Sequence, residues 1–381
     1  MRGREGASRI VVAGGGTGGH LFPALAVADE LKRRHPDAAI SFVGGRRGLE
    51  TKLVPAAGYP LRTMPLSGLK GASVAARAAA AIAAALATVR CLAWMVRDRP
   101  DLTIGVGGYA SGPAVLAARL LGVRTMVMEQ NHFPGAVNRH LAPRVDAVCV
   151  PSEAARARLG GRGIVTGNPV RREFASIGPP PAASEASLLV FGGSRGARSI
   201  NRAASDAIPL LARISPPPRI VHQTGEADEA DVSAAYRAYP GPHEVRAFLD
   251  DMPARLAAAD LVVSRAGATT LAELAAAGRP AILIPYPFAA DDHQRLNAEA
   301  VEEAGAAVVL LDRDLDGGRL AEAVASLVAD PVRRRAMGAA ARRLARTDAA
   351  SLIADVADAL LEGRAPSAGD APSKKEARDV P

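Results

Sequence analysis

The chain has 381 residues, enough for two domains of ordinary size, and its 49% hydrophobic and 23% charged residues are typical of a globular protein. This composition excludes a mainly disordered chain and a disulfide-stapled miniprotein. The net charge of +8 is uneven, since residues 1–168 contain 22 Lys and Arg against 10 Asp and Glu, whereas residues 169–381 contain 25 against 29. The basic half suits an anionic membrane surface, a phosphorylated substrate or nucleic acid, but 3% aromatic residues argue against a stacking platform for single-stranded nucleic acid.

The sequence shows no export signal, because residues 1–8 are polar and the charge-free apolar stretch 78–89 is shorter than a bilayer span. Cys91 and Cys149 each lie in an apolar run, which favours core packing in a reducing compartment. We therefore expect a cytoplasmic protein.

The first half alternates short apolar runs with longer Ala- and Leu-rich stretches. Strands that are apolar on both faces are typical of a parallel sheet covered by helices on both sides. The pattern predicts strands over 10–13, 40–43, 102–106, 125–129 and 147–150, with a first helix over 21–34.

The same alternation restarts after a Pro-rich connection, with predicted strands over 188–191, 219–223, 261–264, 281–285 and 308–310. We therefore predict an α/β protein with two Rossmann-like, doubly wound parallel-sheet domains, residues 1–168 and 169–350, facing across a cleft. The helix-like stretch 351–363 is predicted to cross back to the first domain, and 364–381 is predicted to be disordered.

Three glycine-rich segments, 14–20, 105–113 and 192–198, each follow a predicted strand. Glycine lets the backbone turn sharply and approach a ligand, and the helix N-terminus that follows offers N–H groups to an anion. A single loop of this kind can also be a tight turn that binds no ligand, but three of them predict two phosphorylated substrates. The first loop lacks the acid that NAD binding needs after the second strand, although Arg46 and Arg47 there could accept the 2′-phosphate of NADP.

Several polar side chains follow predicted strands. His20, at a helix start, is suited to take a proton near neutral pH, or it simply packs there. Thr269 and Thr270 either cap a helix, with Glu273 completing a capping box, or bind a ligand. The polar segment 129–139 suits recognition of sugar hydroxyls, as do Gln294 and Asn297, three residues apart on one helix face.

Asp312, Asp314 and Asp316 form two overlapping D-x-D patterns. Carboxylates with this spacing can bind Mg²⁺ together with a nucleotide diphosphate. The two glycines and the amphipathic helix that follow favour a solvated turn instead, so we assign no metal.

Taken together, the motifs occur in the order found in one family: GGGTGGHLFP, GGYASGP, EQNHFPG, GNPVR, GGSRGARSIN, FLDDM, AGATTLAE and DDHQRLNA. From about residue 10 to beyond residue 310, the chain resembles the MurG family of peptidoglycan N-acetylglucosaminyltransferases. The resemblance implies the two-Rossmann arrangement called GT-B, with the acceptor in the N-terminal domain and UDP-GlcNAc in the C-terminal domain.

The resemblance also implies an inverting transfer of GlcNAc from UDP-GlcNAc to the C4 hydroxyl of the muramoyl sugar of undecaprenyl-pyrophosphoryl-MurNAc-pentapeptide (lipid I), giving lipid II. It implies no tightly bound cofactor and no metal. The enzyme would be peripheral on the cytoplasmic face of the bacterial inner membrane and would serve cell-wall biogenesis, cell shape and cell division. Other cell-wall proteins are possible partners, and nucleic acid is not expected.

The resemblance assigns roles to individual residues. His20 is the expected general base, Ser194 would bond the donor phosphates, the main chain of Leu249 would read uracil and Glu273 would hold the ribose. The expected UDP-GlcNAc site comprises Thr17, Gly18, Gly19, Asn131, Arg171, Ser194, Leu249, Ala268, Thr269, Thr270, Leu271, Ala272, Glu273, Gln294 and Asn297. The expected acceptor site comprises Gly15, Gly16, Gly107, Gly108, Tyr109 and Ser111. Arg195 stands where family members commonly carry Gln.

Ile82, Leu86 and Val89 form an apolar stripe, near Trp94 and Arg90, that suits either a membrane interface or a buried core helix. The alternatives for function are another two-Rossmann UDP-sugar enzyme, such as a UDP-GlcNAc 2-epimerase, and an NADP-dependent oxidoreductase. A non-catalytic protein that binds the membrane surface is the alternative from another class.

Overall fold

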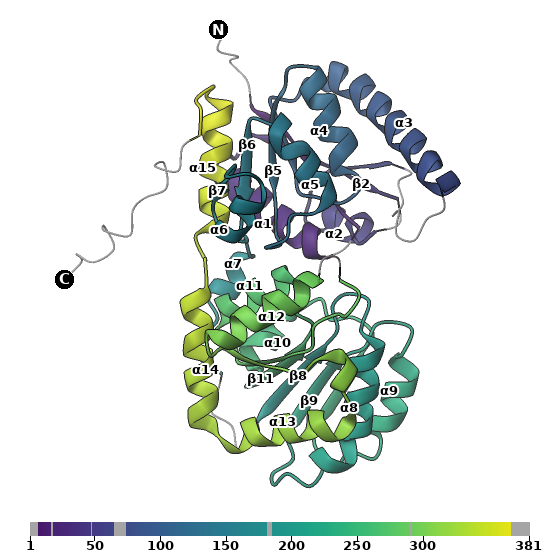
Figure 1. Ribbon diagram of the computed structural model, residues 1–381, viewed down its shortest axis with the longest axis vertical. Helices are drawn as coiled ribbons and strands as arrows, with labels where there is room; N and C mark the ends of the chain where they lie inside the picture. Colours follow the sequence, from purple (N-terminus) through teal and green to yellow (C-terminus); the bar gives the residue numbers. More distant parts are fainter. Residues whose placement is uncertain are drawn as a thin grey trace, which may run out of the picture. The chain divides into compact units, whose positions relative to one another are not determined.

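The computed structural model describes residues 7–16, 18–46, 48–64, 74–180, 185–289 and 292–366. The chain divides into two compact units (Figure 1). Unit 1 comprises Met1–Arg171 and Asp348–Pro381, and unit 2 comprises Arg172–Thr347. The predicted boundary lies between residues 168 and 169, three residues before the end of the first segment of unit 1. From residue 367 onward, the tail that was predicted to be disordered lies outside the described residues.

Unit 1 contains a seven-stranded sheet of order β3-β2-β1-β4-β5-β6-β7, in which all neighbouring strands are parallel. The strands are β1 (Arg9–Ala13), β2 (Ala39–Gly45), β3 (Leu61–Met64), β4 (Leu102–Gly105), β5 (Arg124–Met128), β6 (Ala147–Val150) and β7 (Ile164–Val165). The helices are α1 (Gly18–Arg34), α2 (Glu50–Ala56), α3 (Val74–Asp98), α4 (Ser111–Leu120), α5 (Ala136–Leu141), α6 (Glu153–Arg158) and α15 (Ala349–Leu361).

Both faces of this sheet are covered, as the side chains of β1 illustrate. Ile10 and Val12 lie in a core with residues of α1 and α15, whereas Val11 and Ala13 lie in a second core with residues of α3 and α4. Alternate side chains of a strand point to opposite faces, so an all-apolar strand such as β1 is stable only between two layers of helices. Figure 1 shows α15 and α3 on opposite sides of the sheet.

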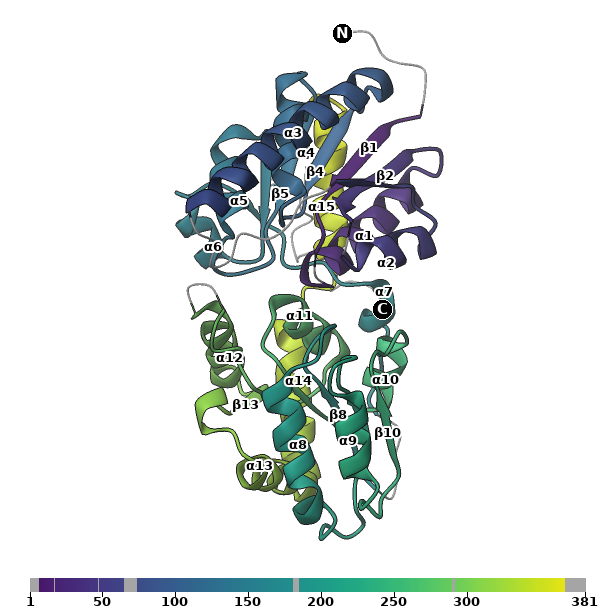
Figure 2. The ribbon, with the colours of Figure 1, turned by 90° about the vertical axis from the view of Figure 1, so that its right-hand side faces the viewer.

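Unit 2 repeats this plan with a six-stranded parallel sheet of order β10-β9-β8-β11-β12-β13. Its strands are β8 (Ser187–Phe191), β9 (Arg219–Gln223), β10 (His243–Arg246), β11 (Leu261–Ser264), β12 (Ala281–Leu283) and β13 (Ala307–Val309). Its helices are α7 (Arg172–Ala175), α8 (Arg198–Leu211), α9 (Glu229–Tyr236), α10 (Met252–Ala258), α11 (Ala268–Ala277), α12 (His293–Glu303), α13 (Gly317–Ala329) and α14 (Pro331–Leu344). Helix α8 packs beside α9 (Figure 2) and against α13.

The predicted fold class, α/β with two Rossmann-like parallel sheets, is confirmed. The pattern missed β3, β7 and β10, each of which is an edge strand. An edge strand has one strand neighbour and is often short and partly polar, so it lacks the apolar run that marks a central strand. Strand β10, with sequence His-Glu-Val-Arg, illustrates this.

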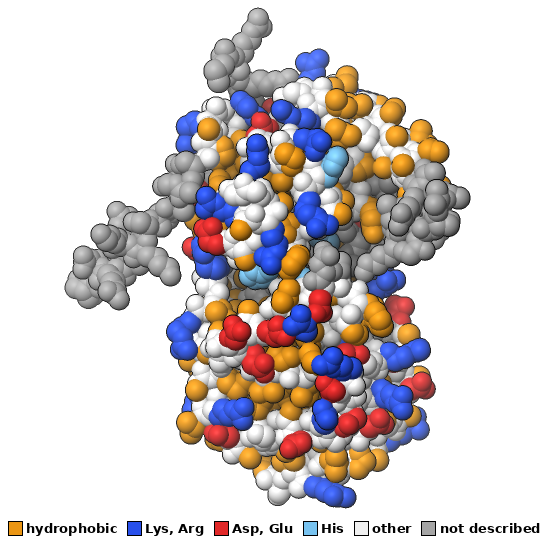
Figure 3. Space-filling model, in the orientation of Figure 1, with side chains coloured by type: hydrophobic (Ala, Val, Ile, Leu, Met, Phe, Trp, Pro, Cys, Tyr) orange, Lys and Arg blue, Asp and Glu red, His pale blue; other side chains and the backbone are white. Residues whose placement is uncertain are grey.

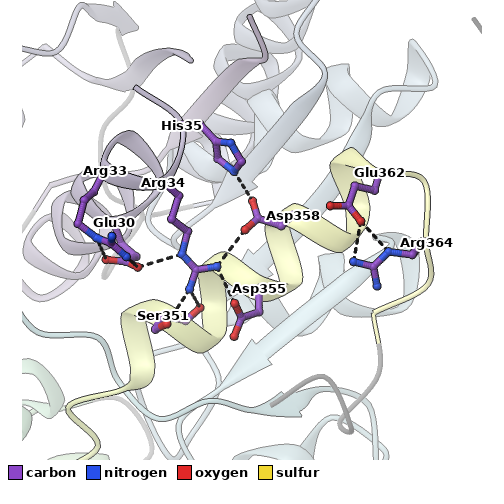
Figure 4. Close-up of polar contacts among 9 residues, drawn as sticks. All are labelled: Glu30, Arg33, Arg34, His35, Ser351, Asp355, Asp358, Glu362 and Arg364. Atoms are coloured by element: carbon purple, nitrogen blue, oxygen red, sulfur yellow. Dashed lines mark hydrogen bonds and ion pairs between the residues drawn. The ribbon is translucent and has the colours of Figure 1, made fainter. Parts of the chain in front are cut away.

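Helix α15 belongs to unit 1, although it follows unit 2 in the sequence. Ile353 and Ala357 lie in the same core as Leu31 of α1. Beside this apolar contact, Arg34 at the end of α1 donates to Oδ1 of Asp355 (2.6 Å), to Oδ2 of Asp358 (2.9 Å) and to Ser351 on α15 (Figure 4). Arg34 also donates to Glu30 on its own helix (2.9 Å), and His35 contacts Asp358 (2.7 Å). Apolar packing and the polar contacts of Arg34 therefore hold α15 on unit 1.

Candidate active site

In unit 1 the strand order reverses between β1 and β4. Ligands of open parallel sheets bind beyond the carboxyl ends of the strands at such a reversal. The first two glycine loops follow β1 and β4, and they pack directly against each other. A Cβ on Gly14 would lie 2.2 Å from Cγ2 of Val106, and a Cβ on Gly108 would lie 2.6 Å from the carbonyl oxygen of Gly15. The fold thus brings four predicted acceptor residues together: Gly15, Gly16, Gly107 and Gly108.

His20 lies in the first turn of α1, which begins at Gly18 rather than at the predicted residue 21. The ring contacts the second loop, since a Cβ on Gly107 would lie 2.9 Å from its Cδ2. Its Nδ1 is buried and has no hydrogen-bond partner within the described part of the chain. Burial lowers the pKa of His20 below its ordinary value, and the charge of Glu129 opposes that shift. The imidazole is therefore neutral at neutral pH, as a general base must be.

The segment that follows β5 is organised around the buried carboxylate of Glu129. Its Oε1 accepts from the backbone N–H groups of Gln130 (3.0 Å) and Asn131 (2.8 Å) and from the Asn131 side chain (3.1 Å). Its Oε2 accepts from the N–H of Gly135 (2.9 Å) and from Nδ2 of Asn138 (2.9 Å). The carboxylate fixes the loop that carries Asn131, a residue predicted to contact the donor sugar, and it supplies the negative charge that acts on His20.

Other predicted residues of unit 1 differ in accessibility. Tyr109 is 43% exposed and Gly19 is exposed, so both can reach a ligand. Ser111 is fully buried, and a Cβ added at Gly105 would lie 2.5 Å from the Oγ of Ser111. The proposed acceptor site therefore does not include Ser111. Thr17 lies outside the described residues.

Arg171, in the Gly-Asn-Pro-Val-Arg motif, lies beside the start of α1. Its guanidinium stacks over the ring of Phe22, 4.8 Å from the ring centroid. Phe22 in turn packs on Gly18, where a Cβ would lie 3.0 Å from the ring. A cation is therefore held by an aromatic face next to the first glycine loop.

Glu50 bonds to the first glycine loop, and the sequence did not predict it as a residue of this site. It is the first residue of α2 and is 1% exposed. Its Oε2 accepts from the N–H of Gly16 (3.0 Å), and its Oε1 accepts from the N–H of Gly45 (2.8 Å). The sequence signal was the cluster of glycines around the end of the second predicted strand, which alone does not show what those glycines enclose.

In unit 2 the strand order reverses between β8 and β11, and the third glycine loop follows β8. The loop turns tightly, with the N–H of Gly196 donating to the carbonyl of Gly193 (2.9 Å). A Cβ on Gly196, which has a φ of 73°, would lie 1.7 Å from the carbonyl oxygen of Thr224, so only glycine fits. Ser194 is half-buried and Arg195 is exposed at the tip of this loop.

Gln223, at the end of β9, connects this loop to the predicted uracil-reading segment. It is 2% exposed. Its Nε2 donates to the carbonyl of Gly193 (2.9 Å), and its Oε1 accepts from the N–H of Leu249 (3.0 Å). The main chain of Leu249 is predicted to read uracil, and its N–H is thus already bonded to a side chain of unit 2. Sequence reasoning missed Gln223, because nothing in the sequence shows that two distant loops meet at it.

The segment after β11 corrects one prediction. Helix α11 begins at Ala268 with Gly267 as its N-cap and without a side-chain capping bond, so the capping box of Thr270 and Glu273 is wrong. Thr269 and Glu273 are buried in the first turns of this helix. The other predicted residues of this segment, Ala268, Thr270, Leu271 and Ala272, are on the same helix.

Helix α12 carries the two residues predicted to read GlcNAc hydroxyls. Gln294 accepts from the N–H of Tyr286 (3.0 Å). Asn297 is buried, donates weakly to the carbonyl of Ala266 (3.4 Å), and its Oδ1 has no partner within the described part of the chain. A free amide acceptor next to the start of α11 suits a hydroxyl donor on a ligand.

Asp312 of the D-x-D pattern accepts from Arg265 (2.5 Å) and from Ser199 (2.6 Å). Arg265 also donates to the carbonyls of Ile284 and Pro285 (3.1 Å each), so Asp312 helps fix the loop after β12. Among the residues that the structure describes, no group of three His, Cys, Asp or Glu side chains is placed to hold a metal ion.

Two parallel-sheet units, each with a glycine loop at the reversal of its strand order, are typical of proteins that bind phosphorylated ligands, and comparison with known proteins identifies the class. Residues 10–150 match the Glycosyltransferase family 28 N-terminal domain, and residues 187–354 match the Glycosyltransferase family 28 C-terminal domain. The protein is thus a glycosyltransferase.

Curated relatives narrow the class. The UDP-N-acetylglucosamine--N-acetylmuramyl-(pentapeptide) pyrophosphoryl-undecaprenol N-acetylglucosamine transferase of Anaeromyxobacter sp. (strain Fw109-5) is 45% identical, over 93% of this chain and 94% of that protein. The protein of the same name from Geobacter sp. (strain M21) is 44% identical, over 91% of this chain and 94% of that protein. The chain belongs to this family, the MurG transferases, and the sequence-based resemblance is confirmed.

Solved structures support the same family and fold. The crystal structure of Acinetobacter baumannii MurG matches with a TM-score of 0.71 and 29% identity, covering 92% of this chain and 99% of that one. A crystal structure of a UDP-N-acetylglucosamine 2-epimerase matches with a TM-score of 0.67 but only 14% identity, covering 95% of this chain and 99% of that one. The second likeness is one of fold alone, so the epimerase alternative has no support beyond the shared architecture.

Proposed function

We propose that this protein transfers GlcNAc from UDP-GlcNAc to the C4 hydroxyl of the muramoyl sugar of undecaprenyl-pyrophosphoryl-MurNAc-pentapeptide, with inversion to a β linkage. The observation that carries the proposal is the 45% identity, over 93% of the chain, to a transferase named for these substrates. The product is lipid II, and the pathway is peptidoglycan synthesis.

The chemistry follows from the loops of each unit. The bond between the sugar C1 and the UDP oxygen breaks, and a bond forms between C1 and the acceptor oxygen. His20, neutral because burial lowers its pKa, takes the proton of the acceptor hydroxyl. The negative charge that grows on the leaving diphosphate is stabilised by N–H groups of the third glycine loop and the start of α8, with Ser194 at the loop tip.

The binding roles divide between the units. Ser194, the segment 268–273, Gln294 and Asn297 of unit 2 hold UDP-GlcNAc, together with the main chain of Leu249. The two glycine loops of unit 1 and Tyr109 hold the acceptor diphosphate. Gly18, Gly19, Asn131 and Arg171 of unit 1 contact the donor sugar. The exposed guanidinium of Arg195 adds positive charge at the tip of the donor loop.

Acceptor-dependent release of UDP tests the proposal. Purified protein is incubated with UDP-GlcNAc and a lipid I analogue, and both UDP and the disaccharide lipid are quantified. We expect UDP only when the acceptor is present, and an increase of one GlcNAc in the acceptor mass. Release of UDP without acceptor, or conversion of UDP-GlcNAc to its 2-epimer, would count against the proposal.

We further propose that unit 1 docks on the cytoplasmic face of the inner membrane through α3. Ile82, Leu86 and Val89 are 60–62% exposed, so this stripe does not lie in the core. Leu120 of the adjacent helix α4 is also exposed, and Figure 3 shows hydrophobic side chains gathered over this region. The exposed Arg90 adds electrostatic attraction, worth about 1 kcal/mol near an anionic surface.

Length and composition alone would let Ala79–Asp98 of α3 cross a membrane. However, Ala87, Cys91 and Met95 of the same helix lie in the core of unit 1 with residues of β1 and α4. These core contacts favour a helix that lies at the membrane surface with one face in the protein.

Vesicle binding tests the docking surface. We expect the protein to sediment with vesicles that contain anionic lipid and to be released at high salt. Leu86→Ser should weaken sedimentation several-fold, whereas Val332→Ser, at a similarly exposed position on α14 of unit 2, should not. Salt-insensitive sedimentation, or equal loss in both variants, contradicts docking through α3.

A further inference from the structure

The first glycine loop is built around a buried carboxylate. Glu50 projects from the start of α2 into the space between the loop after β1 and the turn after β2. Its two oxygens accept from one N–H in each of these segments, Gly16 (3.0 Å) and Gly45 (2.8 Å). One side chain therefore ties the two segments together from inside unit 1.

Glycines enclose this carboxylate on several sides. A Cβ on Gly15 would lie 2.6 Å from its Oε1, and a Cβ on Gly48 would lie 1.9 Å from its Oε2. A Cβ on Gly44 would lie 2.7 Å from its Cγ. Any side chain at these three positions would displace the carboxylate. Ligand contact does not explain Gly44 and Gly48, whereas the need to surround Glu50 does.

The carboxylate also determines which loop amides are available to a ligand. Backbone N–H groups of glycine loops commonly bind phosphate. Here the N–H of Gly16 points inward and is already bonded to a carboxylate. Glu50 thus fixes the conformation of the loop and turns one amide away from the anion that the loop is proposed to bind.

We propose that Glu50 is a positioning residue for the acceptor. Its carboxylate sets the path of Gly14–Gly16 from behind, and the loop in that path receives the acceptor diphosphate. The inference rests on the proposed function, because it takes the loop to contact the diphosphate of the lipid acceptor. Glu50 itself touches no substrate.

Two variants test the inference by different routes. Glu50→Gln keeps the shape of the side chain, but its NH₂ group must face one of the two N–H donors, so one bond is lost. Gly48→Ala leaves Glu50 unchanged and displaces its carboxylate, and the backbone of Gly48 does not have the positive φ that would itself exclude alanine. Gly178→Ala is the matched control, since a Cβ at Gly178 would meet nothing within 4 Å.

The measurements are the KM for a lipid I analogue, kcat, and the Kd for UDP, which unit 2 is proposed to hold. We expect Glu50→Gln and Gly48→Ala each to raise the acceptor KM about tenfold, with the Kd for UDP within twofold of wild type. The control should match wild type in all three values.

Two results would overturn the inference. One is an unchanged acceptor KM in both variants. The other is a fall in kcat and UDP binding together at constant acceptor KM, which is the result of partial unfolding. If the wild-type protein transfers no GlcNAc in the same assay, the proposed function fails instead, so the two failures are distinguishable.

Discussion

His20 has three features that fit its proposed role as general base: a place near the strand-order reversal of the unit 1 sheet, contact with the second glycine loop, and a pKa that burial lowers. Desolvation disfavours the charged imidazolium, and the nearby carboxylate of Glu129 limits that effect. The residue is therefore ready to accept a proton over the physiological pH range.

The pH dependence of kcat/KM tests the role of His20. Because the pKa of His20 lies below the ordinary value of about 6.5, we expect kcat/KM to decrease on the acid side only below pH 6.5, where His20 becomes protonated. His20→Ala should lower kcat by about 10²–10⁴-fold, and its residual activity should lack that decrease. A decrease that persists in the variant would assign the titration to another group.

Gln223 gives a prediction for the donor site. Gln223→Leu removes both the bond to the Gly193 carbonyl and the bond to the Leu249 amide. At about 1 kcal/mol for each bond, we expect the KM for UDP-GlcNAc to rise about tenfold or more, with an unchanged acceptor KM. Equal changes in both KM values would contradict a role confined to the donor site.

At the scale of the element, α1 carries the proposed catalytic base at its start and the contacts to α15 at its end. Its first turn carries His20 and its last turn carries Arg34, which bonds to Asp355, Asp358 and Ser351 of α15 (Figure 4). The basic last turn of α1 also complements the negative end of the helix dipole. The returning helix therefore packs on the same helix that carries His20, the proposed base.

Arg34→Ala tests these polar contacts between α1 and α15. The change leaves Asp355 and Asp358 without their shared cation and removes a partner of the buried Glu30. Because the guanidinium is mostly buried, we expect the free energy of unfolding to fall by about 2–4 kcal/mol and amide exchange in α15 to rise. Arg33→Ala is the control. Its side chain is 54% exposed and pairs with the same Glu30, so a much smaller loss of stability than for Arg34→Ala is expected, because solvent screens exposed ion pairs. Equal costs would contradict a specific role for Arg34.

At the scale of the whole molecule, three histidines are kept neutral by burial. Burial lowers the pKa values of His20, His132 and His222, the last to about 3. His222 lies in the core of unit 2 between Tyr236 (3.1 Å) and Asn201 (3.1 Å). Below pH 6.5 the unfolded chain binds more protons at these sites than the folded chain, so stability is present above that pH and is lost as pH falls.

Equilibrium unfolding between pH 7 and pH 5 measures this effect. Because the pKa of His222 is about 3, this residue should cost about 1.4 kcal/mol of stability per pH unit below 6.5. His222→Gln should be less stable than wild type at pH 7, and the difference should shrink by about that amount per unit as pH falls. Parallel pH profiles for the two proteins would show that His222 does not contribute.

The sequence by itself determined the fold class, the positions of the glycine loops and the family. Buried parallel strands, glycine turns and ordered motifs are local patterns along one chain, and local patterns are readable without a structure. The three strands that it missed lie at sheet edges, where one-sided pairing leaves no continuous apolar run.

Only the tertiary structure decided which groups act on those loops. Glu50 and Gln223 each bond to backbone atoms of segments that are distant in sequence, and a backbone N–H or carbonyl has no residue-specific signature. The capping box was wrong for a related reason, since the chain geometry at Gly267, not the presence of Thr270 and Glu273, fixed where α11 begins. Contacts made to the backbone across a fold depend on the path of the whole chain, and they become visible only when that path is known.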